Sequence, residues 1–167
     1  MARFSRLLVL LAIAAMPAAL FVIASRLPSE NRGLPAGTYL PDSLLVTTTG
    51  ETVRTHSWRG RPTLVVLFRA GCEACEEEIA NLEALAPETA PLRIALVSVE
   101  PSCTLECSLP VYLDPTGEFL RRTERLMVPV LYWVSPMGRI QYVRTGLRSF
   151  QEDAALLHRL LEGTPKP

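Results

Sequence analysis

The feature that most constrains the fold is a pair of segments, Thr63–Phe68 and Leu92–Val99, in which apolar residues dominate and do not alternate with polar ones. Such runs are typical of strands buried on both faces, as in a parallel sheet. Between them apolar residues recur at helical spacing, and Pro87 ends the pattern. This order predicts a βαβ unit with parallel strands and a right-handed crossover. The apolar helical positions are Ile79, Leu82, Leu85 and Ala86.

The second half of the chain predicts two further strands and a closing helix. Val130–Val134 and Ile140–Arg144 read as strands joined by a tight turn at Gly138, and Phe150–Glu162 reads as a helix with one apolar face. The order βαβ followed by ββα predicts an α/β fold with a central mixed sheet and flanking helices. Three shorter elements complete the prediction: a hairpin of Leu44–Thr48 with Thr52–Thr55, and a helix near Glu118–Leu126.

The N-terminus carries an uncharged, mostly apolar segment, Leu7–Ser25, after a basic start at Arg3 and Arg6. A helix needs roughly 20 apolar residues to cross a bilayer, so this segment is just long enough. The alternative is a cleaved signal peptide with small residues near Ala24. We predict a signal anchor or transmembrane helix at 1–26, a linker at 27–38 and a folded domain at 39–167. A basic start favours a cytoplasmic N-terminus, which puts the domain on the periplasmic side of the inner membrane.

Charge excludes one class of partner. Lys and Arg together number 17, as do Asp and Glu, so the formal net charge is zero. No basic run is present, whereas a nucleic-acid interface needs clustered Lys and Arg to displace counterions. No GxGxxG or phosphate-binding loop occurs either, and we predict no cofactor and no bound metal.

Two cysteines, Cys72 and Cys75, open the predicted helix directly after the first buried strand. Unpaired N–H groups and the helix dipole at this end favour a thiolate at Cys72, and Cys75 lies one turn later, within reach for a disulfide. A redox centre, half of a zinc site and a structural staple are the possible readings. A staple is the weakest of the three, because a four-residue loop constrains little unfolded-chain entropy.

A second element makes the redox reading stronger. Val128-Pro129 precedes a strand, where a cis peptide bond can form a tight entry turn. At this point the chain resembles the thioredoxin superfamily, and within it the membrane-tethered TlpA/ResA-like thiol-disulfide oxidoreductases. The resemblance covers roughly Tyr39–Gly163. It rests on the order of elements and on the segments SWRGRPTLVVLFRAGCEACEEE, VYLDPTGEF and VPVLYWVSPMGRI.

The resemblance implies roles for individual residues. Cys72 corresponds to the nucleophile and Cys75 to the resolving cysteine, while Pro129 after Val128 corresponds to the cis-proline that faces the disulfide. It also implies protein dithiol or disulfide substrates and a membrane or periplasmic electron donor. Cytochrome c maturation and the reduction of a metal-site cysteine are common roles of such proteins.

Two acidic residues bear on the direction of electron flow. Glu73 and Glu78 match carboxylates that ResA-like members carry. A carboxylate near Cys72 opposes thiolate formation, and a less stable thiolate makes the reduced protein a better reductant. We therefore expect a reductant. Gly71 departs from the family, which usually has an aromatic residue before the first cysteine, and this departure leaves the direction open.

Cys103 and Cys107 follow the second buried strand as Cys72 follows the first. Parallel strands end at the same edge of a sheet, so the two pairs are expected to be neighbours. A disulfide pinning the Cys103–Cys107 loop is the plain interpretation. A second redox couple and a four-cysteine zinc site are the alternatives.

Two rival functions follow from the cysteines. One is a copper- or zinc-binding, or copper-delivery, protein of the same fold. The other is a peroxiredoxin-type peroxidase, which is disfavoured because Phe68–Gly71 lacks the Pro and the Thr or Ser that such enzymes place before the attacking cysteine.

Overall fold

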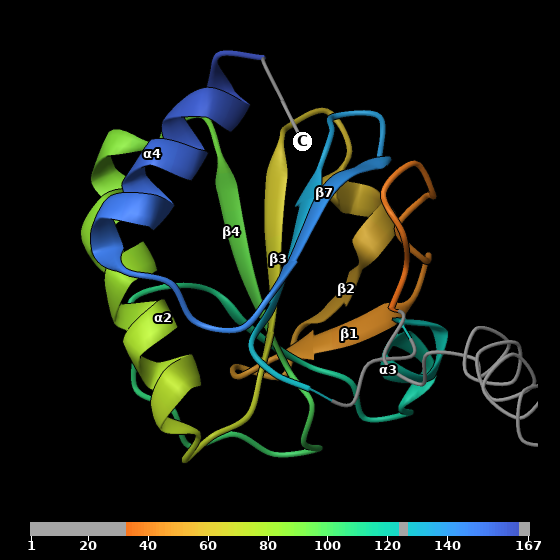
Figure 1. Ribbon diagram of the computed structural model, residues 1–167. Helices are drawn as coiled ribbons and strands as arrows, with labels where there is room; N and C mark the ends of the chain where they lie inside the picture. Colours follow the sequence, from red (N-terminus) through yellow and green to blue (C-terminus); the bar gives the residue numbers. More distant parts are fainter. Residues whose placement is uncertain (1–32, 124–126, 164–167) are drawn as a thin grey trace, which may run out of the picture. The chain divides into compact units, whose positions relative to one another are not determined.

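The computed structural model describes residues 33–123 and 127–163, all of which belong to one compact unit, Asn31–Pro167. Its centre is a seven-stranded mixed sheet in the order β2-β1-β5-β4-β3-β6-β7 (Figure 1). The segment 1–26, predicted as an anchor, lies outside the described residues. Among the helices that are described, none has the length and apolar character needed to span a bilayer.

The predicted βαβ unit forms the middle of the sheet. Strands β3 (Thr63–Phe68) and β4 (Arg93–Ser98) pair in parallel, and helix α2 (Glu73–Leu85) connects them. Every residue of β3 is buried, as expected for a strand covered on both faces. β6 (Val130–Val134) lies antiparallel on the other side of β3, and β7 (Ile140–Thr145) follows it at the edge. The βαβ–ββα order is thereby confirmed.

The remaining elements extend the sheet and cover it. β1 (Leu44–Thr47) and β2 (Thr52–Arg54) form the predicted hairpin, and β1 also pairs with β5 (Val111–Leu113), which the sequence did not predict. The helices are η1 (Thr55–Trp58), η2 (Ala86–Glu88), α3 (Glu118–Thr123) and α4 (Phe150–Leu161). A capping box of Ser149 and Glu152 begins α4.

Alternate residues of β3 point to opposite faces and divide the core in two. Leu64, Val66 and Phe68 face α2 and α4, which lie side by side on one face of the sheet (Figure 1). Val65 and Leu67 face the other side, where α3 packs. We call the first core the α2/α4 cluster; its helical members include Ile79, Leu82, Leu156, Leu157 and Leu160.

The folded domain begins before the predicted boundary at residue 39. The Gly37 N–H donates to the Ile140 carbonyl (2.7 Å), and the Ile140 N–H donates to the Thr38 carbonyl (2.8 Å). Tyr39 forms a β-bridge with Arg139. The end of the predicted linker is therefore paired with the start of β7, an interaction between residues about a hundred positions apart that composition does not reveal.

Candidate active site

Cys72 stands where β3 gives way to α2. Residues 69–71 form the turn, and Gly71 has a φ of 72°, in the left-handed region that suits glycine. Cys72 is the N-cap of α2, and its carbonyl accepts the backbone N–H groups of Cys75 (2.8 Å) and Glu76 (3.0 Å). The half-buried Cys72 side chain thus lies at the N-terminal, positive end of the helix dipole.

Cys75 lies in the first turn of α2 and is fully buried. Burial is the largest cause that raises its pKa from an ordinary 9.0 to about 12, and the neighbouring Cys72 adds to the rise. The backbone and the charge of Arg69 act in the opposite direction. Cys75 is therefore a protonated thiol at neutral pH, and Cys72 is the sulfur that a partner reaches first.

Alkylation of the reduced protein is expected to separate the two thiols. A pKa of about 12 in place of 9.0 leaves Cys75 with about a thousandfold less thiolate than an ordinary cysteine. Iodoacetamide near pH 7 should modify Cys72 while Cys75 stays unmodified, as read by mass spectrometry of quenched samples. In denaturant both should react alike. Equal rates in the native protein would contradict this assignment of the nucleophile.

The predicted proline element lies beside this turn. The Val128–Pro129 peptide bond is cis. Leu67 of β3 pairs with Val130 of β6, so Pro129 enters β6 at the same end of the sheet where β3 leads to Cys72. Val128 packs against the α2/α4 cluster, to whose edge Cys72 also belongs. The structure therefore brings Cys72, Cys75, Val128 and Pro129 to one edge of the sheet.

Glu78, one turn after Cys75, belongs to a buried cluster of charges. Its side chain has no solvent exposure and forms an ion pair with Arg144 of β7. Arg144 also lies 3.1 Å from an Asp153 carboxylate oxygen on α4, and it donates a hydrogen bond to the Gly146 carbonyl (3.1 Å). The Gly146 N–H in turn donates to the Pro129 carbonyl (2.9 Å). Arg144 therefore links the CxxC helix to the cis-proline segment.

Two carboxylates share this one guanidinium. Burial raises the pKa of Glu78 above its usual value, and Arg144 opposes the rise while Asp153 adds to it. Burial likewise raises the pKa of Asp153 against the opposing charge of Arg144. Both carboxyls are therefore displaced toward their protonated forms, with Arg144 as the opposing charge.

Arg144 and Asp153 were not among the residues predicted for the site. Arg144 occupies a strand position that alternation places on the same face as Tyr142, which packs on the α2/α4 cluster. A buried Glu78 demands a cation, but the sequence alone does not say which one. Glu73, by contrast, is exposed in the first turn of α2. Its effect on the thiols stays a prediction.

All four cysteines are free thiols. Cys103 and Cys107 are half-buried in the segment between β4 and β5 and pack against the α2/α4 cluster. No group of three or more His, Cys, Asp or Glu residues within the described ranges is arranged to hold a metal ion. The four-cysteine zinc site stays an untested alternative. The disulfide within the second pair stays a prediction.

Comparison with known proteins places this geometry in a structural class. No protein-family model matches the sequence, and no curated protein matches it significantly. Solved structures do match. A thio-disulfide isomerase from Thermus thermophilus is 24% identical, with a TM-score of 0.61 over 80% of this chain and 100% of that one.

Two further structures agree. The thioredoxin domain of a thiol-disulfide oxidoreductase from Bacteroides vulgatus is 20% identical, with a TM-score of 0.63 over 77% of this chain and 99% of that one. StoA from Bacillus subtilis is 16% identical, with a TM-score of 0.58 over 72% of this chain and 98% of that one. The described chain therefore has a thioredoxin-like fold, as the sequence predicted.

Proposed function

We propose that this protein is a thiol-disulfide oxidoreductase that acts outside the cytoplasm through Cys72 and Cys75 and works as a reductant. The observation that carries the proposal is the asymmetry of the two thiols. A half-buried Cys72 caps α2, while a fully buried Cys75 in the next turn is protonated. This is the arrangement that nucleophilic attack followed by internal resolution requires.

The reaction consists of two exchanges. The Cys72 thiolate attacks one sulfur of a substrate disulfide, forming a mixed disulfide and releasing the first substrate thiolate, which takes up a proton. Cys75 then loses its proton and attacks Cys72, which forms the Cys72–Cys75 disulfide and frees the second substrate thiol. Two electrons pass from the protein to the substrate, and an external dithiol must return them for the next cycle.

The burial of Cys75 supports the reducing direction. Because burial raises the pKa of Cys75, the reduced state gains little from thiolate formation. A reduced form that is poorly stabilised corresponds to a more negative potential.

The location and partners of the proposal rest on the sequence. The apolar segment at 1–26 would anchor the domain on the periplasmic side of the inner membrane, where protein disulfides are the substrates. A membrane or periplasmic dithiol protein is the electron donor that such an arrangement needs. The similarity to a thiol-disulfide oxidoreductase and to a thio-disulfide isomerase supports this class of substrate.

A redox titration tests the proposal. The protein is equilibrated in thiol-disulfide buffers of graded potential, free thiols are trapped, and disulfides are mapped by mass spectrometry. We expect a two-electron transition at Cys72–Cys75 with a midpoint at or below about −270 mV, the value of a reducing thioredoxin. A midpoint near −120 mV would indicate an oxidase. Absence of any transition at this pair would refute the enzyme assignment.

A further inference from the structure

The segment that carries Cys103 and Cys107 leaves the sheet next to the turn that carries Cys72. Phe68 and Ser98 are paired at the ends of β3 and β4, and the Val99 N–H donates to the Phe68 carbonyl (2.8 Å). Just beyond the ends of the two strands, the Arg69 Nε lies 4.0 Å from a Glu100 carboxylate oxygen. The two connections therefore start side by side at the same edge of the sheet.

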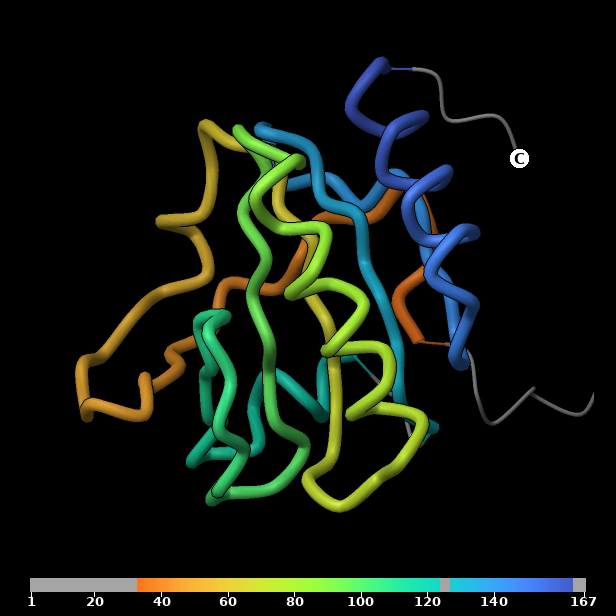
Figure 2. Tube along the Cα trace, turned by 90° about the vertical axis from the view of Figure 1, so that its left-hand side faces the viewer, coloured from red at the N-terminus to blue at the C-terminus, as the bar shows by residue number. Residues whose placement is uncertain are grey.

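The other end of this segment is fixed to α2. Ser108 donates two hydrogen bonds to the same Glu83 carboxylate oxygen, one from its backbone N–H and one from its hydroxyl (2.7 Å). Glu83 is eleven residues after Cys72, which puts both on one face of α2. The segment therefore meets α2 on the face that begins with Cys72, and Figure 2 shows it rising beside β4.

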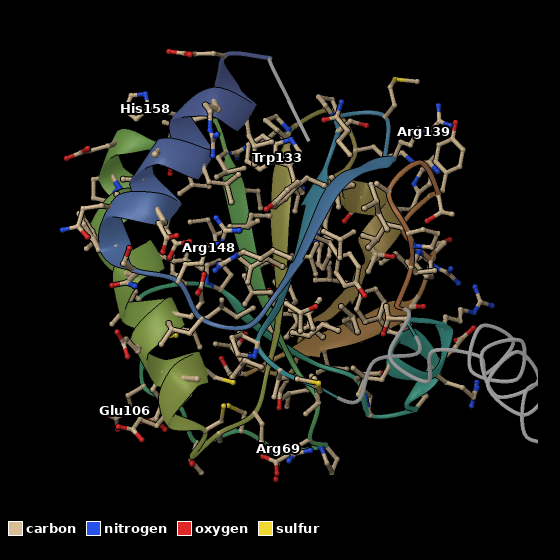
Figure 3. The ribbon with its side chains drawn as sticks, in the orientation of Figure 1. Arg69, Glu106, Trp133, Arg139, Arg148 and His158 are labelled. Carbon is tan, nitrogen blue, oxygen red and sulfur yellow. The ribbon has the colours of Figure 1, made fainter. Side chains whose placement is uncertain are left out.

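Burial within the segment alternates residue by residue. Thr104, Glu106 and Ser108 are exposed, and Figure 3 shows Glu106 projecting outward beside the first turns of α2. The intervening side chains are half-buried against the α2/α4 cluster, the same core that Cys72 and Cys75 contact. This period of two is that of an extended chain. The inward side chains are Cys103, Leu105, Cys107 and Leu109.

An extended course has a consequence for the two cysteines. Four residues of extended chain span up to about 13 Å, whereas a disulfide needs Cα atoms about 4.4–6.8 Å apart. Cys103 is the inward residue nearest the active-site edge, and Cys107 lies next to the anchored Ser108. Burial, and less strongly the charges of Glu83 and Cys103, raises the pKa of Cys107, so the two thiols influence each other and a bend in the chain would bring them together.

Few hydrogen bonds fix the course of this segment. Residues 101–109 make no backbone–backbone hydrogen bond within the part of the chain that the structure describes. Their contacts are apolar packing, the Glu83–Ser108 bonds and two weak sulfur contacts: the Leu105 N–H to the Cys103 sulfur (3.4 Å) and the Cys107 thiol to the Leu109 carbonyl (3.5 Å). Changing its course therefore breaks no sheet or helix bond.

We propose that Cys103 and Cys107 form a second redox centre that exchanges electrons with Cys72–Cys75 within one chain; this extends the proposed function and rests on it. The Cys103 thiolate attacks the Cys72 sulfur of the oxidised pair. The Cys72–Cys75 bond breaks, a Cys72–Cys103 bond forms, and Cys75 leaves and takes up a proton.

The second step completes the transfer. The Cys107 thiolate attacks Cys103, the Cys72–Cys103 bond breaks, and Cys72 leaves as a thiolate. The second pair has then lost two electrons and two protons. The first pair has gained both electrons and one proton, on Cys75, and the other proton goes to solvent while Cys72 stays a thiolate. In the fully reduced chain each cysteine pair stores two electrons. The Cys103–Cys107 pair can then reduce the Cys72–Cys75 disulfide after a substrate has been reduced.

A variant that lacks both resolving thiols, Cys75 and Cys107, traps the intermediate. Full-length Cys75→Ser/Cys107→Ser protein is incubated with reduced and oxidised glutathione, free thiols are alkylated, and disulfides are mapped. Glutathione on Cys72 should be displaced by Cys103, so that a Cys72–Cys103 disulfide becomes the main product. Thiols tethered in one chain reach effective concentrations in the millimolar range, which favours the internal bond.

The matched control moves the thiol by one residue. In Cys75→Ser/Cys107→Ser/Cys103→Ser/Thr104→Cys protein the thiol sits at an outward position of the same segment. We expect roughly tenfold less disulfide to Cys72 than in Cys75→Ser/Cys107→Ser, given the millimolar advantage of a correctly placed tethered thiol. Equal yields in both variants, or Cys72 carrying only glutathione in both, would overturn the proposal.

A redox titration of the unmodified protein shows whether the internal exchange alone is wrong or the proposed oxidoreductase function is wrong as well. Coupled titration of both pairs, with a Cys72–Cys103 species at intermediate potentials, supports the internal exchange. Titration of Cys72–Cys75 alone, with Cys103 and Cys107 unchanged throughout, overturns the exchange and leaves the oxidoreductase standing. Absence of any redox transition at Cys72–Cys75 refutes both the internal exchange and the proposed oxidoreductase function.

Discussion

Replacing Cys72 by serine is expected to abolish disulfide reduction, lowering the rate by at least about a thousandfold, because a serine hydroxyl is not ionised at neutral pH and cannot displace a thiolate from sulfur. Cys75 does not substitute for it, since it is fully buried and protonated. Reduction of a disulfide-bonded protein substrate, followed by turbidity or thiol release, gives the rate.

The Cys72→Ser variant should remain folded, because the replaced side chain lies at the edge of the core. Circular dichroism and the urea midpoint verify this. Glu77→Gln is the matched control, since Glu77 is exposed on the same helix and outside the site. Full activity in Cys72→Ser would show that the reaction does not start at this sulfur and would refute the proposed mechanism.

Replacing Arg144 by methionine is expected to cost about 3–5 kcal/mol in the free energy of unfolding, because breaking a buried ion pair leaves uncompensated charge. Arg144 faces two carboxylates, Glu78 and Asp153, and all three side chains are nearly inaccessible to solvent. Urea unfolding of the reduced protein measures the loss. Arg122→Met is the matched control, since Arg122 pairs with Glu118 on the surface at 2.8 Å. That pair should contribute no more than about 1 kcal/mol.

The loss in Arg144→Met should depend on pH with a definite sign. Arg144 opposes the upward pKa shifts of Glu78 and Asp153, so its removal raises both further in the folded state. Carboxyls with raised folded pKa values destabilise the fold as pH rises through those values. The variant should therefore be less impaired at about pH 5 than at about pH 8. Adding Glu78→Gln and Asp153→Asn should restore part of the stability at the higher pH. A loss independent of pH would contradict the assigned charges.

The centre of the fold was predictable because its signals are local. Uninterrupted apolar runs identify β3 and β4, helical spacing identifies α2, and the closing hairpin carries its glycine turn. β5 was missed because Val111–Leu113 is three residues long and lies between Pro110 and Asp114, too short for any periodicity to show. Its existence depends on β1 and β4 as neighbours on either side.

In the candidate site, too, the residues with local sequence signals were predictable and the others were not. Cys72, Cys75 and Pro129 were found because their chemistry depends on spacing and on adjacency to a strand. Arg144 is different. Nothing near it in the sequence distinguishes it from any arginine of an edge strand, and its role follows from Glu78 and Asp153, which come from other elements. Burial of a charge reveals that a partner exists, but only the tertiary structure identifies it.

The pairing of residues 37–40 with the start of β7 bears on how the domain can be produced. Edge strands with unpaired N–H and C=O groups are templates for aggregation. In this chain the Arg139 side chain, at the tip of the last hairpin (Figure 3), donates to the Gly37 carbonyl (2.6 Å), and the Leu40 N–H donates to the Gly138 carbonyl (2.9 Å). A recombinant fragment that begins at Pro41 would lose this short protective strand and leave one margin of the sheet open to neighbouring molecules. A fragment that begins before Gly37 keeps it.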